Sequence, residues 1–107
     1  MHMIDEFDLI RQFFSVPPQN NAVDLAVGDD AALFRVSPAH QCVVSSDMLV
    51  SGTHFFADVA PRALGHKALA VNLSDLAAMG AEPIGFTLSL ALPEVDADWL
   101  GEFSAGL

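Results

Sequence analysis

The sequence has 107 residues, of which 52% are hydrophobic and 17% charged, a composition typical of one compact globular domain rather than a disordered chain. Fourteen acidic residues against four basic ones give a formal net charge of −10. This charge argues against nucleic acid and anionic membrane surfaces as partners, because affinity for phosphate groups on such surfaces comes from Lys and Arg.

The first 50 residues predict a short helix followed by two strands. Residues 4–15 place apolar side chains at helical spacing with acidic residues in the first turn, and Pro17 then ends the pattern. Two apolar runs, 25–36 and 42–50, flank the turn-like segment SPAHQ, which is compatible with an antiparallel hairpin.

The second half of the chain predicts helix, strand and helix. Residues 61–80 form a mostly buried helix that begins at Pro61 and ends near Gly80. Residues 84–92 alternate as in a strand, with Phe86, Leu88, Leu90 and Leu92 on the core face. A last helix, capped by Asp96, runs to Leu107 without a stop signal, so we expect a fragment of a longer protein. The fold class expected is α+β, with a mixed or antiparallel sheet covered by helices.

The cysteine content and the N-terminus predict a cytoplasmic protein. The single cysteine, Cys42, cannot form an internal disulfide, and its apolar surroundings favour a core thiol over a catalytic one. The N-terminus lacks the features of a secretory signal, and no apolar run reaches the ~18 residues of a membrane helix.

Three groups of oxygen-bearing side chains interrupt the most apolar segments. They are Asp29 and Asp30; Ser45, Ser46 and Asp47; and Asn72 with Asp75. On an ideal strand Asp29 and Asp30 point to opposite faces, so the pair is not expected to chelate one ion. Each group has an ordinary explanation, as a turn, a bulge or the polar side of a helix.

Taken together, the three groups favour a hard cation. Their ligands are oxygen atoms without sulfur, which suits Mg²⁺, and no basic residue of the strands shares a face with Asp30 or lies near Asp47. A metal-loaded acidic site can bind a polyphosphate, whereas the acidic residues alone would repel it. The sequence contains no GxxxxGK[ST] loop, so a nucleotide would have to bind through the metal.

His54 follows Gly52 in a predicted loop at the end of the second strand. A histidine alone in a loop is ordinarily structural or exposed. The alternative is a substrate contact, because loops at strand ends line sites more often than cores do. The residues alone leave both interpretations open.

Four segments resemble the N-terminal domain of the bacterial thiamine-monophosphate kinase family. They are VGDDAAL, SSDMLVSGTHF, GHKALAVNLSDLAAMGAEP and LSLALP, at 27–33, 45–55, 65–83 and 88–93. The long helix motif with MGAEP is highly specific, whereas GDD alone is weak. The wider superfamily includes aminoimidazole ribonucleotide synthetase, which shares the ATP-binding architecture.

The resemblance implies transfer of the γ-phosphoryl group of ATP to thiamine monophosphate, with Mg²⁺. Carried over by position, it implies that His54 contacts thiamine monophosphate and that five residues are Mg²⁺ ligands: Asp30, Ser45, Ser46, Asp47 and Asp75. It also implies an N-terminal ATP- and Mg²⁺-binding domain over residues 1–107, whose strands pair with a second subunit in a homodimer barrel. The GGD segment and the C-terminal domain of the family are absent, so we expect the chain to be a poor kinase alone.

Two alternatives remain open. The first is another ATP-dependent enzyme of the aminoimidazole ribonucleotide synthetase type, because the acidic ligand set is shared. The second is a non-catalytic dimerisation module, in which the acidic groups are solvated edges and the apolar strands pair with a partner.

Overall fold

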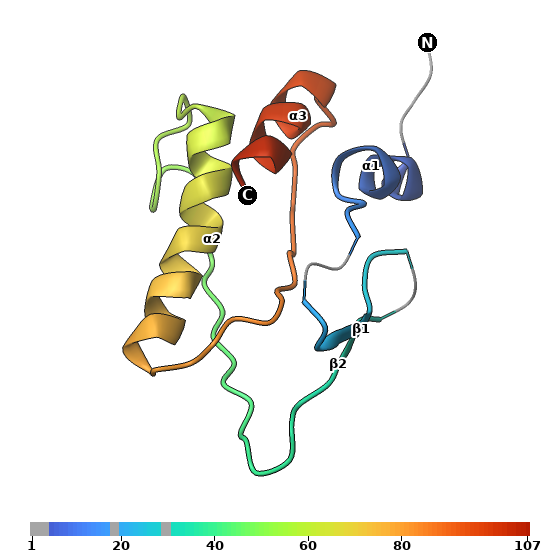
Figure 1. Ribbon diagram of the computed structural model, residues 1–107. Coiled ribbons are helices and arrows are strands. Elements are labelled where there is room, and N and C mark those ends of the chain that lie inside the picture. Colours follow the sequence, from blue (N-terminus) through green and yellow to red (C-terminus); the bar gives the residue numbers. More distant parts are fainter. Residues whose placement is uncertain (1–4, 18–19, 29–30) are drawn as a thin grey trace. The chain divides into compact units, whose positions relative to one another are not determined.

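A computed structural model of the chain describes residues 5–17, 20–28 and 31–107 (Figure 1). The chain divides into two compact units. One unit comprises Met1–Cys42 with Ile84–Val95, and the other comprises Val43–Pro83 with Asp96–Leu107. No helix in the described ranges combines the length and apolar character needed to cross a bilayer.

The first unit begins with helix α1, Glu6–Phe13, which confirms the predicted N-terminal helix with shorter ends. The side chain of Asp5 caps the helix by accepting a hydrogen bond from the Asp8 N–H at 2.8 Å. At the other end the Phe14 N–H donates to the Ile10 carbonyl, which closes the last turn.

The predicted strand 25–36 is wrong, because the chain turns back within it. Strands β1, Val23–Leu25, and β2, Leu33–Phe34, pair antiparallel, with Val23 opposite Phe34. After β1 the chain turns at Gly28, which has φ +113°, a conformation that other residues rarely adopt. An ion pair between Arg35 and Asp24 at 2.6 Å links the two ends of this hairpin.

The predicted strands 42–50 and 84–92 do not form regular strands either. A turn is present in SPAHQ, where the His40 N–H donates to the Ser37 carbonyl, but its flanks do not pair. An isolated strand leaves its backbone donors and acceptors without partners, so alternation alone does not produce a sheet. The antiparallel sheet of the described residues is therefore limited to β1 and β2.

Side chains expected in a core along these two segments are exposed. In the first unit Phe86, which was predicted on the core face, is 54% exposed, and Leu88 and Leu90 are also exposed. Cys42 is exposed as well, so the prediction of a core thiol is wrong. Burial of these side chains required a paired sheet, which the segments do not make within this chain.

The second unit is built on helix α2, Pro61–Ala78, which begins at the predicted proline. Its end follows the predicted signal, because Gly80 adopts φ +68° and the Ala81 N–H donates to the Leu76 carbonyl. The expectation of a mostly buried helix is wrong: within α2 only Leu64 and Gly65 are buried. Only α3 packs against this helix among the described elements.

Helix α3, Ala97–Gly106, confirms the predicted C-terminal helix and its cap. The Asp96 carboxylate accepts a hydrogen bond from the Trp99 N–H at 3.1 Å. This helix supplies two residues to the core of the second unit, where Leu100 is fully buried and Phe103 nearly so. The ring of Trp99 stacks on Phe103 with centroids 5.0 Å apart.

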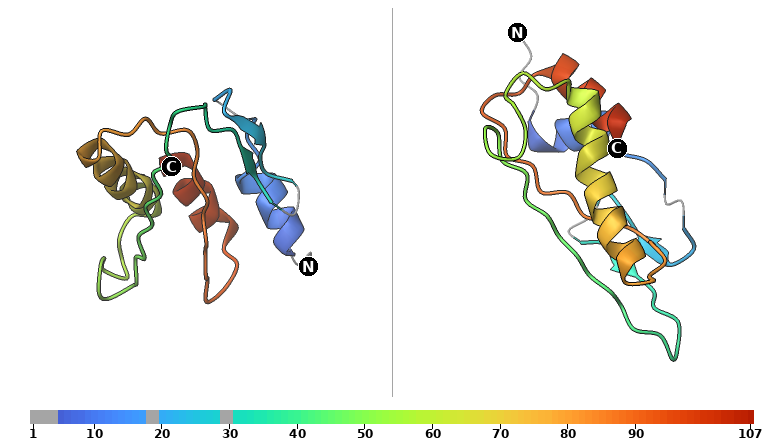
Figure 2. Two further views of the ribbon diagram at one scale, coloured as in Figure 1. Left: turned by 90° about the horizontal axis from the view of Figure 1, so that it is seen from below. Right: turned by 90° about the vertical axis from the view of Figure 1, so that its left-hand side faces the viewer.

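Helices α2 and α3 lie side by side (Figures 1 and 2) and approach closely through two glycines. A Cβ atom on Gly65 would overlap the carbonyl oxygen of Phe103, and one on Gly106 would overlap the carbonyl oxygen of Arg62. In both cases the obstacle is backbone, which cannot rotate away as a side chain can. The crossing therefore requires glycine on both helices.

We expect Gly65→Ala to lower the free energy of unfolding by about 1–3 kcal/mol, because the methyl group would force the helices apart. Helix propensity alone predicts the opposite sign, a gain of up to about 1 kcal/mol. Urea unfolding measures the change. Ala63→Ser, which adds one heavy atom on the exposed side of α2, serves as the control, with a change of about 0.5 kcal/mol. Stabilisation by Gly65→Ala would contradict the close crossing.

Candidate functional site

The first predicted metal ligand, Asp30, lies outside the described residues, as does Asp29. Their expected placement on opposite faces requires a continuous strand. The residues immediately before them, Val27 and Gly28, form a turn, so β1 does not continue as a strand through these two positions. The role predicted for Asp30 stays a prediction.

Two further predicted ligands lie close together in the second unit. The Ser45 hydroxyl donates to the Asp75 carboxylate at 3.4 Å, which joins the extended segment 43–50 to α2. At that length the hydrogen bond is weak, and both residues are exposed. Residues 30 positions apart in sequence thus present a hydroxyl and a carboxylate oxygen at one place.

Ser46 and Asp47 are exposed and make no hydrogen bond with any residue that the structure describes. Asn72 donates to the Ala68 carbonyl at 2.9 Å, and its buried Oδ1 has no hydrogen-bond partner in the described part of the chain. Across residues 5–17, 20–28 and 31–107, no three His, Cys, Asp or Glu side chains converge as a metal would require. Since Asp30 is outside these ranges, the full ligand set stays a prediction.

Within the described ranges, no lysine or arginine side chain pairs with Asp47 or Asp75. Each arginine is engaged elsewhere in an ion pair: Arg11 with Asp8, Arg35 with Asp24 and Arg62 with Glu102. The hydrogen bond to Glu102, followed by its charge, raises the pKa of Arg62 above its ordinary value. These pairings leave the two carboxylates available to a cation from solution.

His54 lies in a tight loop that follows Val50. The N–H groups of Thr53 and His54 both donate to the Val50 carbonyl, and the Val50 N–H donates to Nδ1 of His54 at 2.9 Å. Gly52 permits the turn with φ +82°. The histidine ring is therefore held by its own loop rather than extended freely into solvent.

Lys67, which is not among the predicted site residues, contacts this loop. Its ammonium group donates to the backbone carbonyl of His54 at 2.8 Å. The residue lies on α2, one position after His66, and reaches a loop 13 residues earlier in the chain. No local sequence pattern signals such a contact, because it depends on how the loop folds onto the helix.

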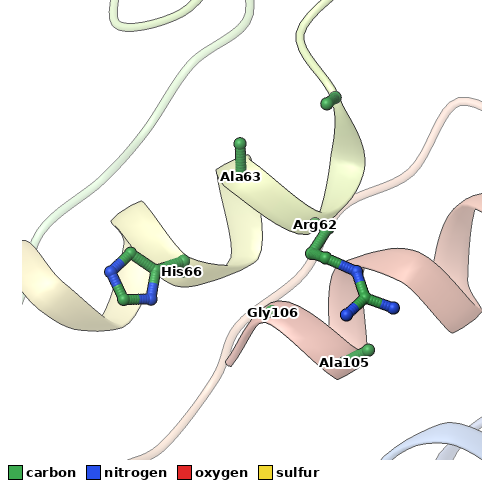
Figure 3. A pocket seen from close by; sticks show the side chains of 6 residues that line it. Arg62, Ala63, His66, Ala105 and Gly106 are labelled. Carbon is green, nitrogen blue, oxygen red and sulfur yellow. The ribbon is translucent and has the colours of Figure 1, made fainter.

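An open groove of about 570 Å³ lies between the start of α2 and the end of α3. Figure 3 shows Arg62 and His66 on α2 and Ala105 and Gly106 on α3 around it. None of the predicted site residues lines this groove. The groove is therefore separate from the predicted ligands Ser45, Ser46, Asp47 and Asp75 in this unit.

Comparison with known proteins places these residues in a family context. The family described as AIR synthase related protein, N-terminal domain, matches residues 28–107. The chain is 50% identical over 103 residues to the thiamine-monophosphate kinase of Escherichia coli (strain K12), covering 95% of this chain and 32% of that protein. For the Haemophilus influenzae enzyme of the same name the identity is 45%, over 95% and 31%. The Bacillus subtilis enzyme is 43% identical over 84% and 28%.

The chain thus spans about a third of the length of these relatives. All the predicted site residues lie within residues 28–107, the range that the family matches. The relatives from Escherichia coli and Bacillus subtilis share one name, thiamine-monophosphate kinase.

We expect Gly52→Ala to loosen the His54 loop by about 1 kcal/mol, because a Cβ has open space at this position and only the positive φ opposes it. Hydrogen exchange should show the Thr53 and His54 amides exchanging about fivefold faster. Gly52→Asn is the matched control and should have a smaller effect, because Asn tolerates the left-handed region better. Equal rates in both variants and the wild type would contradict the loop geometry.

Proposed function

Because this chain belongs to the AIR synthase related proteins, whose N-terminal domain it matches, we propose that it contributes to the ATP-dependent phosphorylation of thiamine monophosphate to thiamine diphosphate. The observation that carries this proposal is the identity of about half of all residues, over 95% of the chain, with proteins named thiamine-monophosphate kinase. A cytoplasmic location accompanies the proposal, since ATP is the phosphoryl donor.

The proposal gives residues 1–107 the role of an N-terminal ATP- and Mg²⁺-binding domain. The chain covers 32% of the Escherichia coli relative, so the remaining contacts of a complete enzyme are assigned to residues beyond this range. We therefore expect full activity only from the protein in its complete native length.

The donor atoms fit a hard cation. Ser45 and Asp75 supply adjacent oxygen atoms, and no Lys or Arg side chain pairs with Asp75 or Asp47 within the described ranges. The residues that would hold Mg²⁺ are Asp30, Ser45, Ser46, Asp47 and Asp75. When bound there, the ion would neutralise charge on the phosphate oxygens of ATP.

The chain's own residues would act by positioning. The carboxylates of Asp47 and Asp75 fix the place at which the nucleotide phosphates bind, and His54 contacts thiamine monophosphate through its ring. No side chain is assigned as a nucleophile, so the phosphoryl group passes directly between the two substrates. The protein would accelerate the reaction by holding the two substrates in line, through proximity and electrostatic stabilisation.

We expect Asp47→Asn and Asp75→Asn each to weaken Mg²⁺-dependent binding of a non-hydrolysable ATP analogue by about tenfold or more, since each removes one anionic ligand. Calorimetry with and without Mg²⁺ on the full-length protein measures this. Asp58→Asn removes an exposed carboxylate of the same unit and should leave the affinity unchanged. Unchanged affinity in both ligand variants would refute the ligand assignment.

A coupled assay distinguishes the proposed reaction from its nearest alternative. The protein should consume ATP when thiamine monophosphate is added and produce thiamine diphosphate. ATP consumption that responds instead to the substrate of an aminoimidazole ribonucleotide synthetase would assign the protein to that type. Absence of any Mg²⁺ or nucleotide binding would favour a dimerisation module.

We also propose that the protein is a homodimer in which the extended segment 43–50 pairs with a second copy. The segment is rich in apolar residues and carries no regular strand within this chain. Val44 is 84% exposed and Met48 is 78% exposed, so the segment presents apolar area to solvent. Pairing would satisfy its backbone groups and bury these side chains together.

A charge placed in this segment tests the dimer. We expect Val44→Glu to shift the full-length protein from dimer to monomer at micromolar concentration, because the carboxylate would lose its hydration in the interface. Analytical ultracentrifugation measures the mass. The control is Val16→Glu, which places the same charge at an exposed valine of the other unit. A monomeric wild type would refute the homodimer.

A further inference from the structure

Lys67 differs from the other basic residues of the chain in its partner. The three arginines all pair with carboxylates, whereas the Lys67 ammonium group donates to a backbone carbonyl, that of His54. The contact joins a regular helix of 18 residues to an exposed loop. It therefore ties the loop to the longest helix of the unit.

The hydrogen bonds within the loop fix the form of the His54 ring. Because the Val50 N–H donates to Nδ1 at 2.9 Å, Nδ1 must carry a lone pair. The neutral ring then bears its proton on Nε2. His54 consequently presents an N–H donor on the side of the ring opposite to its own loop, which suits an oxygen acceptor.

Two anchors hold this donor, and they act on different parts of the residue. Val50 holds the ring, and Lys67 holds the backbone carbonyl. The N–H groups of Thr53 and His54 bond only to Val50, inside the loop, so they do not fix the loop to the helix. Among the hydrogen bonds of residues 50–55 in the described structure, that of Lys67 is the one that reaches α2.

We propose that Lys67 is a positioning residue for His54: it holds the 50–55 loop on α2 so that the Nε2–H of His54 donates to a phosphate-monoester oxygen of the substrate. The identity of that substrate as thiamine monophosphate rests on the proposed function. The orientation of the ring does not, because it follows from hydrogen bonds that are present without any ligand.

The first test is spectroscopic and needs no substrate. In the full-length protein labelled with ¹⁵N-histidine, ring spectra should show His54 as the Nε2–H tautomer, identified by loss of its signals in His54→Gln. Lys67→Met keeps the aliphatic stem but removes the donor. It should leave the tautomer unchanged, because the bond from Val50 lies inside the loop, but it should broaden the His54 ring signals as the loop loses its tie to α2. Lys67→Arg restores a donor and should restore the sharp ring signals.

The second test separates positioning from general stability. Lys67→Met should raise the KM for thiamine monophosphate about three- to tenfold, the effect of losing one hydrogen bond, with the KM for ATP and the melting temperature unchanged. Lys67→Arg should recover most of the loss. Arg35→Met removes one positive charge from the other unit and is the matched control, with both KM values unchanged.

The outcomes separate the two proposals. If the wild type phosphorylates thiamine monophosphate but Lys67→Met leaves both the KM and the width of the His54 ring signals unchanged, the positioning role is refuted. A melting temperature that falls in parallel with activity, without rescue by arginine, also refutes it. If the wild type does not act on thiamine monophosphate, the proposed function fails, and the ring spectra alone decide whether Lys67 positions His54.

Discussion

The close crossing of α2 and α3 is the constraint on which the second unit depends. Gly65 and Gly106 allow each helix backbone to touch the other, and this contact buries Leu64, Leu100 and Phe103. These three side chains are the buried hydrophobic core of the described residues. Without the crossing α2 would have no apolar partner, and a helix is seldom stable in water without tertiary packing.

Helix α2 in turn orders the candidate site. Lys67, in the first half of α2, contacts the His54 loop, and Asp75, in the second half, contacts Ser45. A rigid helix sets the spacing between these two contacts, at about 1.5 Å per residue along its axis. Helix α2 therefore contacts both Ser45 and the His54 loop, and the glycine crossing holds this helix against α3.

The helices were predictable and the sheet was not, for one physical reason. Asp5, Pro61 and Asp96 act on the first turn of their own helices, so their effects can be read from neighbouring residues. The alternation at 84–92 describes only the side chains of a strand. The backbone hydrogen bonds of a sheet also need a neighbouring segment as partner. The same limit applies to the site: Ser45 and Asp75 were assigned to one set, whereas the Lys67 contact was missed because it has no local pattern.

The sequence by itself determined the helix starts, the family membership and the residue types that favour Mg²⁺, because these depend on local spacing and on side-chain chemistry. Tertiary structure decided the rest: the turn at Gly28 that replaces a strand, the exposure of Val44 and Phe86, and the bond that ties His54 to α2. These features arise when distant segments meet or fail to meet. The free energy of such a contact depends on both segments, so it cannot be predicted from the sequence of either one alone.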